Sequence, residues 1–426
     1  MNWKLCNRVC VDRLYASIEQ PVLITRCVFH TLLQLCKSRP SGWVTVTSAA
    51  NLSSRRSMIL PPRHSQVLLA MASVLRRPAP LACQPPVEKV LPGQITLAES
   101  SVGIYEVLRC VPEVAKGPAT QRVVVLTGNP GLAGFYADFA SVLSSELRAE
   151  VVVLGLAGHV SWSLLSAAAS PSQLRHRPPH GLDDQVAHLT EVVAPHLQAA
   201  EEERQPVTLI GHSIGAWLAF RVSQQLGLAR NGASAAPLVL FLMPFLEENM
   251  SDPAYASKSR ALRRFPFVIP LISRVAPLLR SVVPSRVRRW LLSSQVGGME
   301  REYVRLVEEG MLHRGCIENY LFLARTEMFS HHATFATEAL RPLATIGRLA
   351  ALYVSSGDEW APLAMERRLA TEAAVPTTVV SRDEVSHAFS CRSRETNVVA
   401  QWVVERVNEA FPFAVAVARS RTRKLP

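Results

Sequence analysis

The stretch VTLIGHSIGAWL, residues 207–218, decides the fold class of this 426-residue chain. Val207–Ile210 is an apolar run typical of a buried parallel strand, and helical spacing begins at Gly215. Between them lies G-x-S-x-G, in the strand–turn–helix context in which this motif presents a reactive serine. Gly211 and Gly215 are expected to avoid clashes in the sharp turn that raises the Ser213 hydroxyl above a sheet. The pattern predicts a nucleophile elbow with Ser213 as the catalytic nucleophile, against the alternative of a chance match in a loop.

Apolar runs and helical patterns alternate on both sides of this stretch. Residues 95–110 have the alternation of a hairpin. Further runs predict strands at 122–127, 151–154, 238–243, 351–355 and 377–381. Helical patterns cover 134–147, 180–198, 215–225, 361–370 and 397–411. Strand and helix in alternation predict an α/β fold, with a mostly parallel central sheet and helices on both faces.

A nucleophilic serine needs a base that is itself oriented by a carboxylate. In this architecture the acid and the histidine follow the serine in chain order, each on a loop after a later strand. Asp358 ends the run 351–355 in a Gly-Asp turn, and His387 follows the run 377–381. The sequence therefore predicts a Ser213–Asp358–His387 triad. Glu359 and Asp383 remain alternatives for the acid, and an ordinary surface or packed histidine remains the alternative for His387.

Two backbone N–H donors are needed to stabilise the oxyanion of an acyl-transfer intermediate. One is expected from Ile214, directly after the nucleophile. The other is expected from the Gly-Asn-Pro-Gly turn at 128–131, where Asn129 is the candidate because Pro130 has no N–H. The alternative is that this turn only ends a strand. It is not a phosphate loop, because no Gly-Lys-Ser/Thr follows it.

Other histidines are weaker candidates for chemistry. The pair His331-His332 lacks the H-E-x-x-H context of a metal site, and His176 and His180 stand in an expected loop. His212 is expected to pack or to position its neighbours, since residues adjacent to the nucleophile point elsewhere. No metal and no cofactor are predicted.

Residues 254–299 break the alternation. Nine Lys and Arg residues and no acid stand between Asp252 and Glu300, among apolar clusters such as FPFVIPLI at 265–272. Pro266, Pro270, Pro277 and Pro284 are expected to interrupt any long helix. An acid-free segment of this kind can lie on an anionic lipid surface with its arginines reaching the phosphates. A cap packed over the sheet with solvated arginines is the alternative, and both can hold together.

The positive charge of the chain is concentrated near its beginning. Residues 1–87 hold 11 Lys and Arg but two acids, while the whole chain has a formal net charge of +12. The main body is thus close to balanced, which argues against nucleic-acid binding. Five of the eight cysteines also lie in this leader, and the three others form no disulfide framework. The leader has the composition of a transit peptide, or it is a disordered extension. No run of residues is apolar enough for a spanning helix.

Several motifs in order resemble the lipid droplet-associated hydrolase family, over residues 122–411. They are TGNPG at 127–131 with Phe135-Tyr136, GLAGH at 155–159, GHSIG at 211–215, GDEW at 357–360 and SHAF at 386–389. The chain departs from the family at Glu359 and in its basic leader. The resemblance implies an α/β-hydrolase fold with a cap, the same triad, lipid esters such as sterol esters as substrates, and residence on lipid droplets and the endoplasmic reticulum.

These observations together predict an ester hydrolase without a cofactor, whose partners are a lipid ester and a lipid surface contacted through 254–299. A droplet-bound scaffold with vestigial activity and an acyltransferase are the alternatives, and the sequence specifies no oligomeric state. The expected organisation is an N-terminal extension at 1–90, a core at 91–250 and 346–415, a cap at 251–345 and a basic tail at 416–426.

Overall fold

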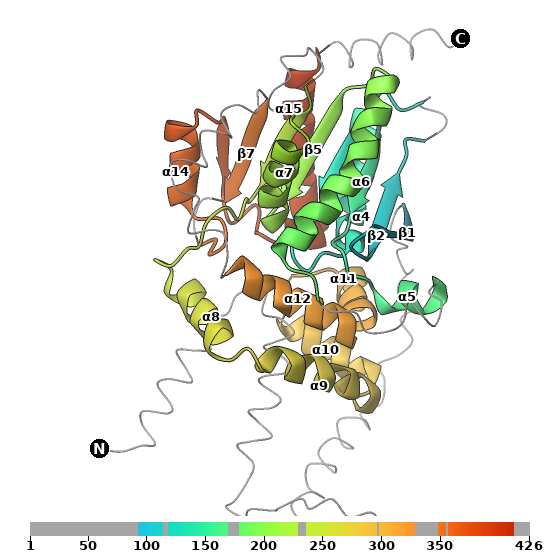
Figure 1. The fold of residues 1–426 in the computed structure, drawn as a ribbon, viewed down its shortest axis with the longest axis vertical. Coiled ribbons are helices and arrows are strands. Elements are labelled where there is room, and N and C mark those ends of the chain that lie inside the picture. Colours follow the sequence, from blue (N-terminus) through green and yellow to red (C-terminus); the bar gives the residue numbers. More distant parts are fainter. Residues whose placement is uncertain are drawn as a thin grey trace, which may run out of the picture. The chain divides into compact units, whose positions relative to one another are not determined.

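A single sheet organises the part of the chain that the structure describes (Figure 1). This computed structural model describes residues 93–113, 118–168, 179–228, 236–295, 298–328, 348–354 and 357–412, which all belong to one of the chain's two units. The N-terminal extension at 1–90, the tail at 416–426, His176 and the pair His331-His332 lie outside the described residues.

The sheet has the strand order β1-β2-β4-β3-β5-β6-β7-β8. β1 and β2 form an antiparallel hairpin, β2 is antiparallel to β4, and all later pairs are parallel. The bounds are Gln94–Glu99, Ile104–Cys110, Gln121–Leu126, Ala149–Leu154, Val207–His212, Leu238–Leu242, Leu349–Val354 and Thr377–Val380 for β1 to β8. This mostly parallel sheet, with helices on both faces, confirms the predicted α/β-hydrolase fold.

The central strands are mostly apolar and are buried along their whole length because helices cover both of their faces. All residues of β3, β5 and β7 are buried. α6 (Leu182–Glu202) and α7 (Ile214–Gln225) pack together on one face, and α4 (Ala137–Leu147) and α15 (Ser393–Ala410) pack together on the other (Figure 1). α14 (Leu363–Glu372) packs against β7 and β8.

Between β6 and β7 the chain forms a group of helices that lies at one end of the sheet in Figure 1. We call these helices the cap helices. They are α8 (Pro253–Arg264), α9 (Val268–Val282), α10 (Ser285–Gln295), α11 (Arg301–Arg305), the π-helix η3 (Leu306–Met311) and α12 (Arg314–Glu327). The domain boundaries at 251 and 345 stay predictions, because residues 329–347 lie outside the described part.

Two expectations about helices were wrong. Pro277 does not interrupt a helix, because α9 runs through it for 15 residues, and Pro270 lies in the first turn of α9, where proline is tolerated. The breaks fall at Pro266 and Pro284, between α8 and α9 and between α9 and α10. A short helix, α5 (Trp162–Ala168), also follows β4, between residues 154 and 180, where no helical pattern was predicted.

No single helix among the described residues is long and apolar enough to cross a membrane. α8 and α9 reach the length and composition of a span only when they are counted together across a 95° bend.

Candidate active site

Ser213 is the single residue between β5 and α7, and it makes the tight turn of the elbow. Its backbone has φ 55° and ψ −124°, a conformation that costs a non-glycine residue free energy. Such strain persists only where the surrounding structure fixes it, and it is frequent at functional sites. The sharp strand-to-helix turn is therefore present, with Ser213 at its strained position, and the role of Ser213 as nucleophile stays a prediction.

The position of Gly211 differs from the prediction. The sequence placed Gly211 in the turn, after a strand that ended at Ile210, but β5 continues through Gly211 to His212. Gly211 is a buried strand residue that pairs with Leu126 of β3 and with Phe241 of β6. The strand continues because both of its neighbours extend far enough to pair with it, which the local sequence does not reveal. Gly211 therefore makes room for the start of α7 from a position in β5, and it is not part of the turn itself.

Close packing of backbone explains why both motif positions are glycine. A Cβ atom at Gly211 would overlap the carbonyl oxygen of Gly215 and lie 2.5 Å from Ala216 Cα. A Cβ atom at Gly215, in the first turn of α7, would lie 2.5 Å from the carbonyl oxygen of Leu126. Both glycines are thus required, because they let the start of α7 lie directly against β5 and β3.

The imidazole of His387 lies between Ser213 and Asp358. His387 Nε2 is 2.9 Å from Ser213 Oγ, and His387 Nδ1 is 2.8 Å from Asp358 Oδ2. Asp358 follows β7 and His387 follows β8, so the ends of three parallel strands bring the three side chains together. The structure thus places at hydrogen-bond distance the residues that the sequence selected for a triad.

The carboxylate of Asp358 is almost completely buried, with 3% of its side chain exposed. Its Oδ1 accepts hydrogen bonds from the backbone N–H groups of Trp360 and Ala361, at 3.0 and 3.2 Å. Burial alone would raise the pKa of Asp358. The nearby charge of His387, its hydrogen bond and the two N–H donors outweigh burial and hold that pKa below its usual value. Asp358 therefore stays ionised and keeps Oδ2 directed at the imidazole.

The two alternatives for the acid lie elsewhere. The Glu359 carboxylate forms an ion pair with Lys258 on α8, and Asp383 is exposed in the loop after β8. Glu359 thus ties a cap helix to the loop that carries Asp358. This contact accounts for a buried glutamate beside the triad acid.

The turn after β3 lies directly against the nucleophile. A Cβ atom at Gly128 would be 3.0 Å from Ser213 Cβ, so a side chain there would push the turn and the serine apart by a few tenths of an ångström. The turn is closed by the Gly131 N–H, which donates to Gly128 O at 2.7 Å. His159 Nδ1 is 2.7 Å from the carbonyl oxygen of Pro130. These contacts fix the turn that contains Asn129 and lies against Ser213.

A buried carboxyl group of the cap helices reaches the same turn. Asn129 Nδ2 donates to Tyr320 O and to Glu327 Oε1, both at 3.1 Å, and both acceptors belong to α12. Burial raises the pKa of Glu327 to about 8, with the hydrogen bond from Asn129 acting in the opposite direction. Helix α12 therefore fixes the side chain of Asn129, the residue whose backbone N–H is predicted to donate to the oxyanion.

Sequence reasoning missed Glu327 and His159 as parts of this site, and it expected His212 to pack or to position its neighbours. The structure gives His212 hydrogen-bond distances to Tyr136 and to His387. The spacing of TGNPG to Phe135-Tyr136 was a signal for Tyr136. No pattern pointed to Glu327, which is one acid among several on an amphipathic helix. His180, expected in a loop, precedes α6, and its backbone N–H donates to Asn319 Oδ1.

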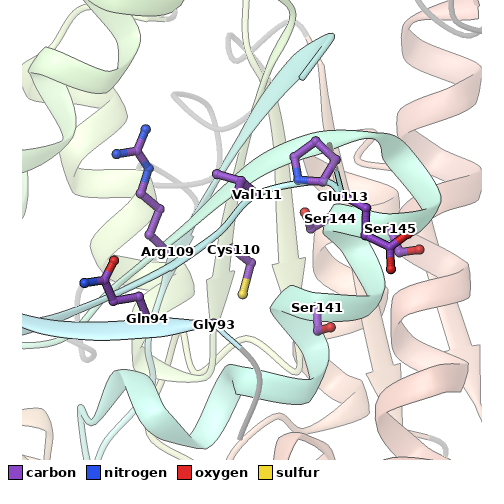
Figure 2. Close-up of a pocket in the computed structure, with 10 residues that line it drawn as sticks. Gly93, Gln94, Arg109, Cys110, Val111, Glu113, Ser141, Ser144 and Ser145 are labelled. Carbon is purple, nitrogen blue, oxygen red and sulfur yellow. The ribbon is translucent and has the colours of Figure 1, made fainter. Parts of the chain in front are cut away.

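Two cavities of the described residues are lined by side chains other than Ser213, Asp358 and His387. Figure 2 shows one of about 530 Å³ between β1, β2 and α4. Cys110, Ser141 and Ser144 line it, and no residue of the triad does. Within the described ranges, no three His, Cys, Asp or Glu side chains are grouped so that they could hold a metal ion.

Comparison with known proteins gives one consistent answer. The family model for lipid-droplet associated hydrolases matches residues 119–390. A lipid droplet-associated hydrolase of Drosophila melanogaster is 32% identical over 132 residues, which are 31% of this chain and 40% of that protein. The Rattus norvegicus protein of the same name is 22% identical over 297 residues, covering 67% of this chain and 85% of the relative.

Among solved structures, a soluble variant of monoglyceride lipase from Saccharomyces cerevisiae is similar with a TM-score of 0.48. It has 10% sequence identity, and the match covers 77% of this chain and 99% of that one. The family match, which spans more than half of the chain, confirms the resemblance and the hydrolase class that the family's description gives. This chain belongs to the lipid-droplet associated hydrolase family.

Proposed function

We propose that the chain is a serine hydrolase of lipid or other hydrophobic esters, sterol esters among them, and that it acts at the surface of lipid droplets. The observation that carries the catalytic part is the His387 imidazole, whose two nitrogens lie 2.9 Å from Ser213 Oγ and 2.8 Å from Asp358 Oδ2. This geometry supports base-activated attack by a serine.

In the proposed mechanism, Asp358 accepts the Nδ1–H of His387 and so fixes the tautomer whose Nε2 can take a proton. His387 removes the proton of Ser213 as Oγ attacks the ester carbonyl carbon. The N–H groups of Ile214 and Asn129 stabilise the oxyanion. His387 then returns the proton to the leaving alcohol, and water, activated by the same base, hydrolyses the acyl-enzyme.

An exposed apolar face on the cap helices supports the proposed contact with a lipid surface. Leu271, Leu278 and Val282 stand 7 and 4 residues apart on α9, hence on one face, and are 49%, 63% and 80% exposed. The opposite face carries the buried residues Ile272 and Ala276, and α9 packs on α12.

The exposed apolar set of the cap region also includes Phe267, just before α9, and Trp290 on α10, at 63% and 68% exposure. Arginines flank it, and each basic residue near an anionic lipid surface can add about 1 kcal/mol of binding free energy.

The catalytic part is tested with a fluorophosphonate probe and a panel of esters that includes a sterol ester, a triacylglycerol and a short-chain ester. Wild type should be labelled, whereas Ser213→Ala should not be. Asp358→Asn should lower the rate roughly 10⁴-fold, because the imidazole loses its orientation. Asp383→Asn, a matched change at an exposed aspartate, should keep full activity. Absence of Ser213-dependent labelling would overturn the assignment and favour a scaffold with vestigial activity. An acyltransferase would be labelled at Ser213 like the hydrolase, but it would pass the acyl group to an acceptor other than water.

The surface part is tested by replacing Leu278, Val282 and Trp290 with serine in cells that form lipid droplets. Recruitment to droplets and to the endoplasmic reticulum is measured by fluorescence. The triple variant should lose droplet recruitment, while activity on a water-soluble ester should be unchanged. Val111→Ser removes an apolar side chain that is 62% exposed far from the cap helices in sequence, and it should not affect recruitment.

A further inference from the structure

A continuous chain of hydrogen bonds joins the turn after β3 to the loop of His387. The Gly128 N–H lies 2.9 Å from Tyr136 Oη, which lies 2.7 Å from His212 Nδ1. His212 Nε2 in turn lies 2.9 Å from the carbonyl oxygen of His387. All three contacts have the length of good hydrogen bonds.

The direction of every bond in this chain follows from its two ends. A backbone N–H can only donate, so Tyr136 Oη accepts from Gly128. The O–H of Tyr136 then donates to His212 Nδ1, because Nδ1 carries no proton when the proton of the neutral imidazole is on Nε2. The carbonyl oxygen of His387 can only accept, so the proton of His212 lies on Nε2. A neutral imidazole with one donor and one acceptor meets both requirements.

The surroundings of the chain keep it in this state. Tyr136 and His212 are 4% and 6% exposed, so water does not compete for their hydrogen bonds. Burial, and then the charge of His387, lower the pKa of His212 to about 3. The ring of Phe389 packs edge-on against His212, with centroids 5.1 Å apart. A buried hydroxyl or a buried imidazole is unfavourable without a hydrogen-bond partner, so the two side chains depend on each other.

The two ends of the chain are the parts of the site that must be placed relative to each other. Gly128 precedes Asn129, whose N–H is the proposed oxyanion donor. His387 is the proposed base, and His212 precedes the nucleophile. The distance between oxyanion donor and base is set through Tyr136 and His212, which themselves touch no reacting atom. A misplacement of about 1 Å at such a site can cost about 10²-fold in rate.

We propose that Tyr136 and His212 are positioning residues, which hold the oxyanion loop and the catalytic histidine in register through the Gly128–Tyr136–His212–His387 hydrogen-bond chain. The proposal rests on the proposed function, because it assigns a role to residues around the same triad.

The test compares Tyr136→Phe, His212→Leu, His212→Gln and the double variant Tyr136→Phe/His212→Leu. Each single break should lower kcat about 10- to 100-fold and leave KM within about threefold, because the groups act on the transition state and not on substrate binding. His212→Gln should recover part of the loss, since its amide can still donate to the His387 carbonyl. The kcat of the double variant should be no lower than that of the poorer single variant, because either substitution alone already interrupts the same hydrogen-bond chain.

Tyr303→Phe is the matched control. Tyr303 is another fully buried tyrosine, and its hydroxyl accepts a hydrogen bond from the Asp138 N–H at 3.4 Å, away from this chain. Its variant should keep kcat even if its melting temperature falls as much as that of Tyr136→Phe. Multiplicative losses in the double variant, an unchanged kcat in Tyr136→Phe, or an equal kcat loss in Tyr303→Phe would overturn the positioning role.

A measurement that needs no turnover separates this proposal from the proposed function. The ¹⁵N chemical shifts of His212 should report a protonated Nε2 and an unprotonated Nδ1 that accepts a hydrogen bond, and the Nδ1 shift should move in Tyr136→Phe. A proton on Nδ1 would refute the hydrogen-bond chain even in an active enzyme. Loss of activity in Ser213→Ala tests the proposed function independently of this result.

Discussion

Asn129 Nδ2 lies 3.1 Å from Glu327 Oε1, and this hydrogen bond joins the turn after β3 to helix α12 of the cap helices. The exposed apolar face of α9 belongs to a helix that packs on α12. One helix thus separates the surface proposed to meet lipid from the residue proposed to stabilise the oxyanion. A shift of α12 would be felt at Asn129 without passing through the sheet.

Glu327 should make the stability of the protein fall as pH rises. Its pKa is raised from 4.5 to about 8, so between these values the folded state holds a proton that the unfolded state has released. The free energy of unfolding should therefore decrease through this window, by up to about 1.4 kcal/mol per pH unit, and level off above pH 8. Urea unfolding at pH 5, 6, 7 and 8 measures this slope.

Glu327→Gln should flatten that slope, because the amide keeps an acceptor for Asn129 but does not titrate. Glu309→Gln on η3 is the control, since Glu309 is an exposed acid of the neighbouring helix, with 46% of its side chain accessible. Equal slopes in wild type and Glu327→Gln would contradict the buried, protonated state of this carboxyl group.

Asn129→Ala should lower kcat about tenfold with little change in KM. The backbone N–H that we assign to the oxyanion hole remains, but its loop loses both hydrogen bonds to α12, so the loss should be smaller than the 10²–10³-fold typical of removing a donor outright. Steady-state kinetics on a short-chain ester measures it. A change confined to KM would instead place the side chain in substrate binding.

Gly215→Ala should destabilise the protein by about 3 kcal/mol or more and abolish activity. The new methyl group would meet the carbonyl oxygens of Leu126 and Thr127 at 2.5 and 2.6 Å, so α7 must move away from β3. Gly181→Ala is the matched control, because its methyl group would find nothing nearer than 3.6 Å. Chemical denaturation of both variants gives the comparison, and similar stabilities would contradict the close packing at the elbow.

The elbow, the triad candidates and the fold were accessible from sequence because each leaves a local signature. Ser213, Asp358 and His387 each follow an apolar run, and parallel strands bring such positions to one edge of the sheet. The structure places these side chains at hydrogen-bond distance, and their catalytic role stays a prediction until it is tested. Boundaries of most strands and helices also agree within a few residues, since buried strands and amphipathic helices have distinct periods.

The remaining features depend on tertiary contacts that no period encodes. Gly211 lies in β5 and not in the turn, because the pairing of β5 with β3 and β6 continues past the apolar run. Glu327 meets Asn129 across 198 positions. Pro277 stays inside α9 because packing of the helix on α12 outweighs the loss of one backbone hydrogen bond. Such outcomes are decided by the assembled fold rather than by local preference.

The positive-φ backbone of Ser213 costs the folded state stability, so a variant that relieves this strain should be more stable even though it has no activity. Glycine adopts that conformation freely, so Ser213→Gly should raise the melting temperature above that of the equally inactive Ser213→Ala, which retains the strain. Differential scanning calorimetry of the two variants would show the difference. The serine side chain at this position thus costs stability, a cost that the proposed nucleophile role would explain.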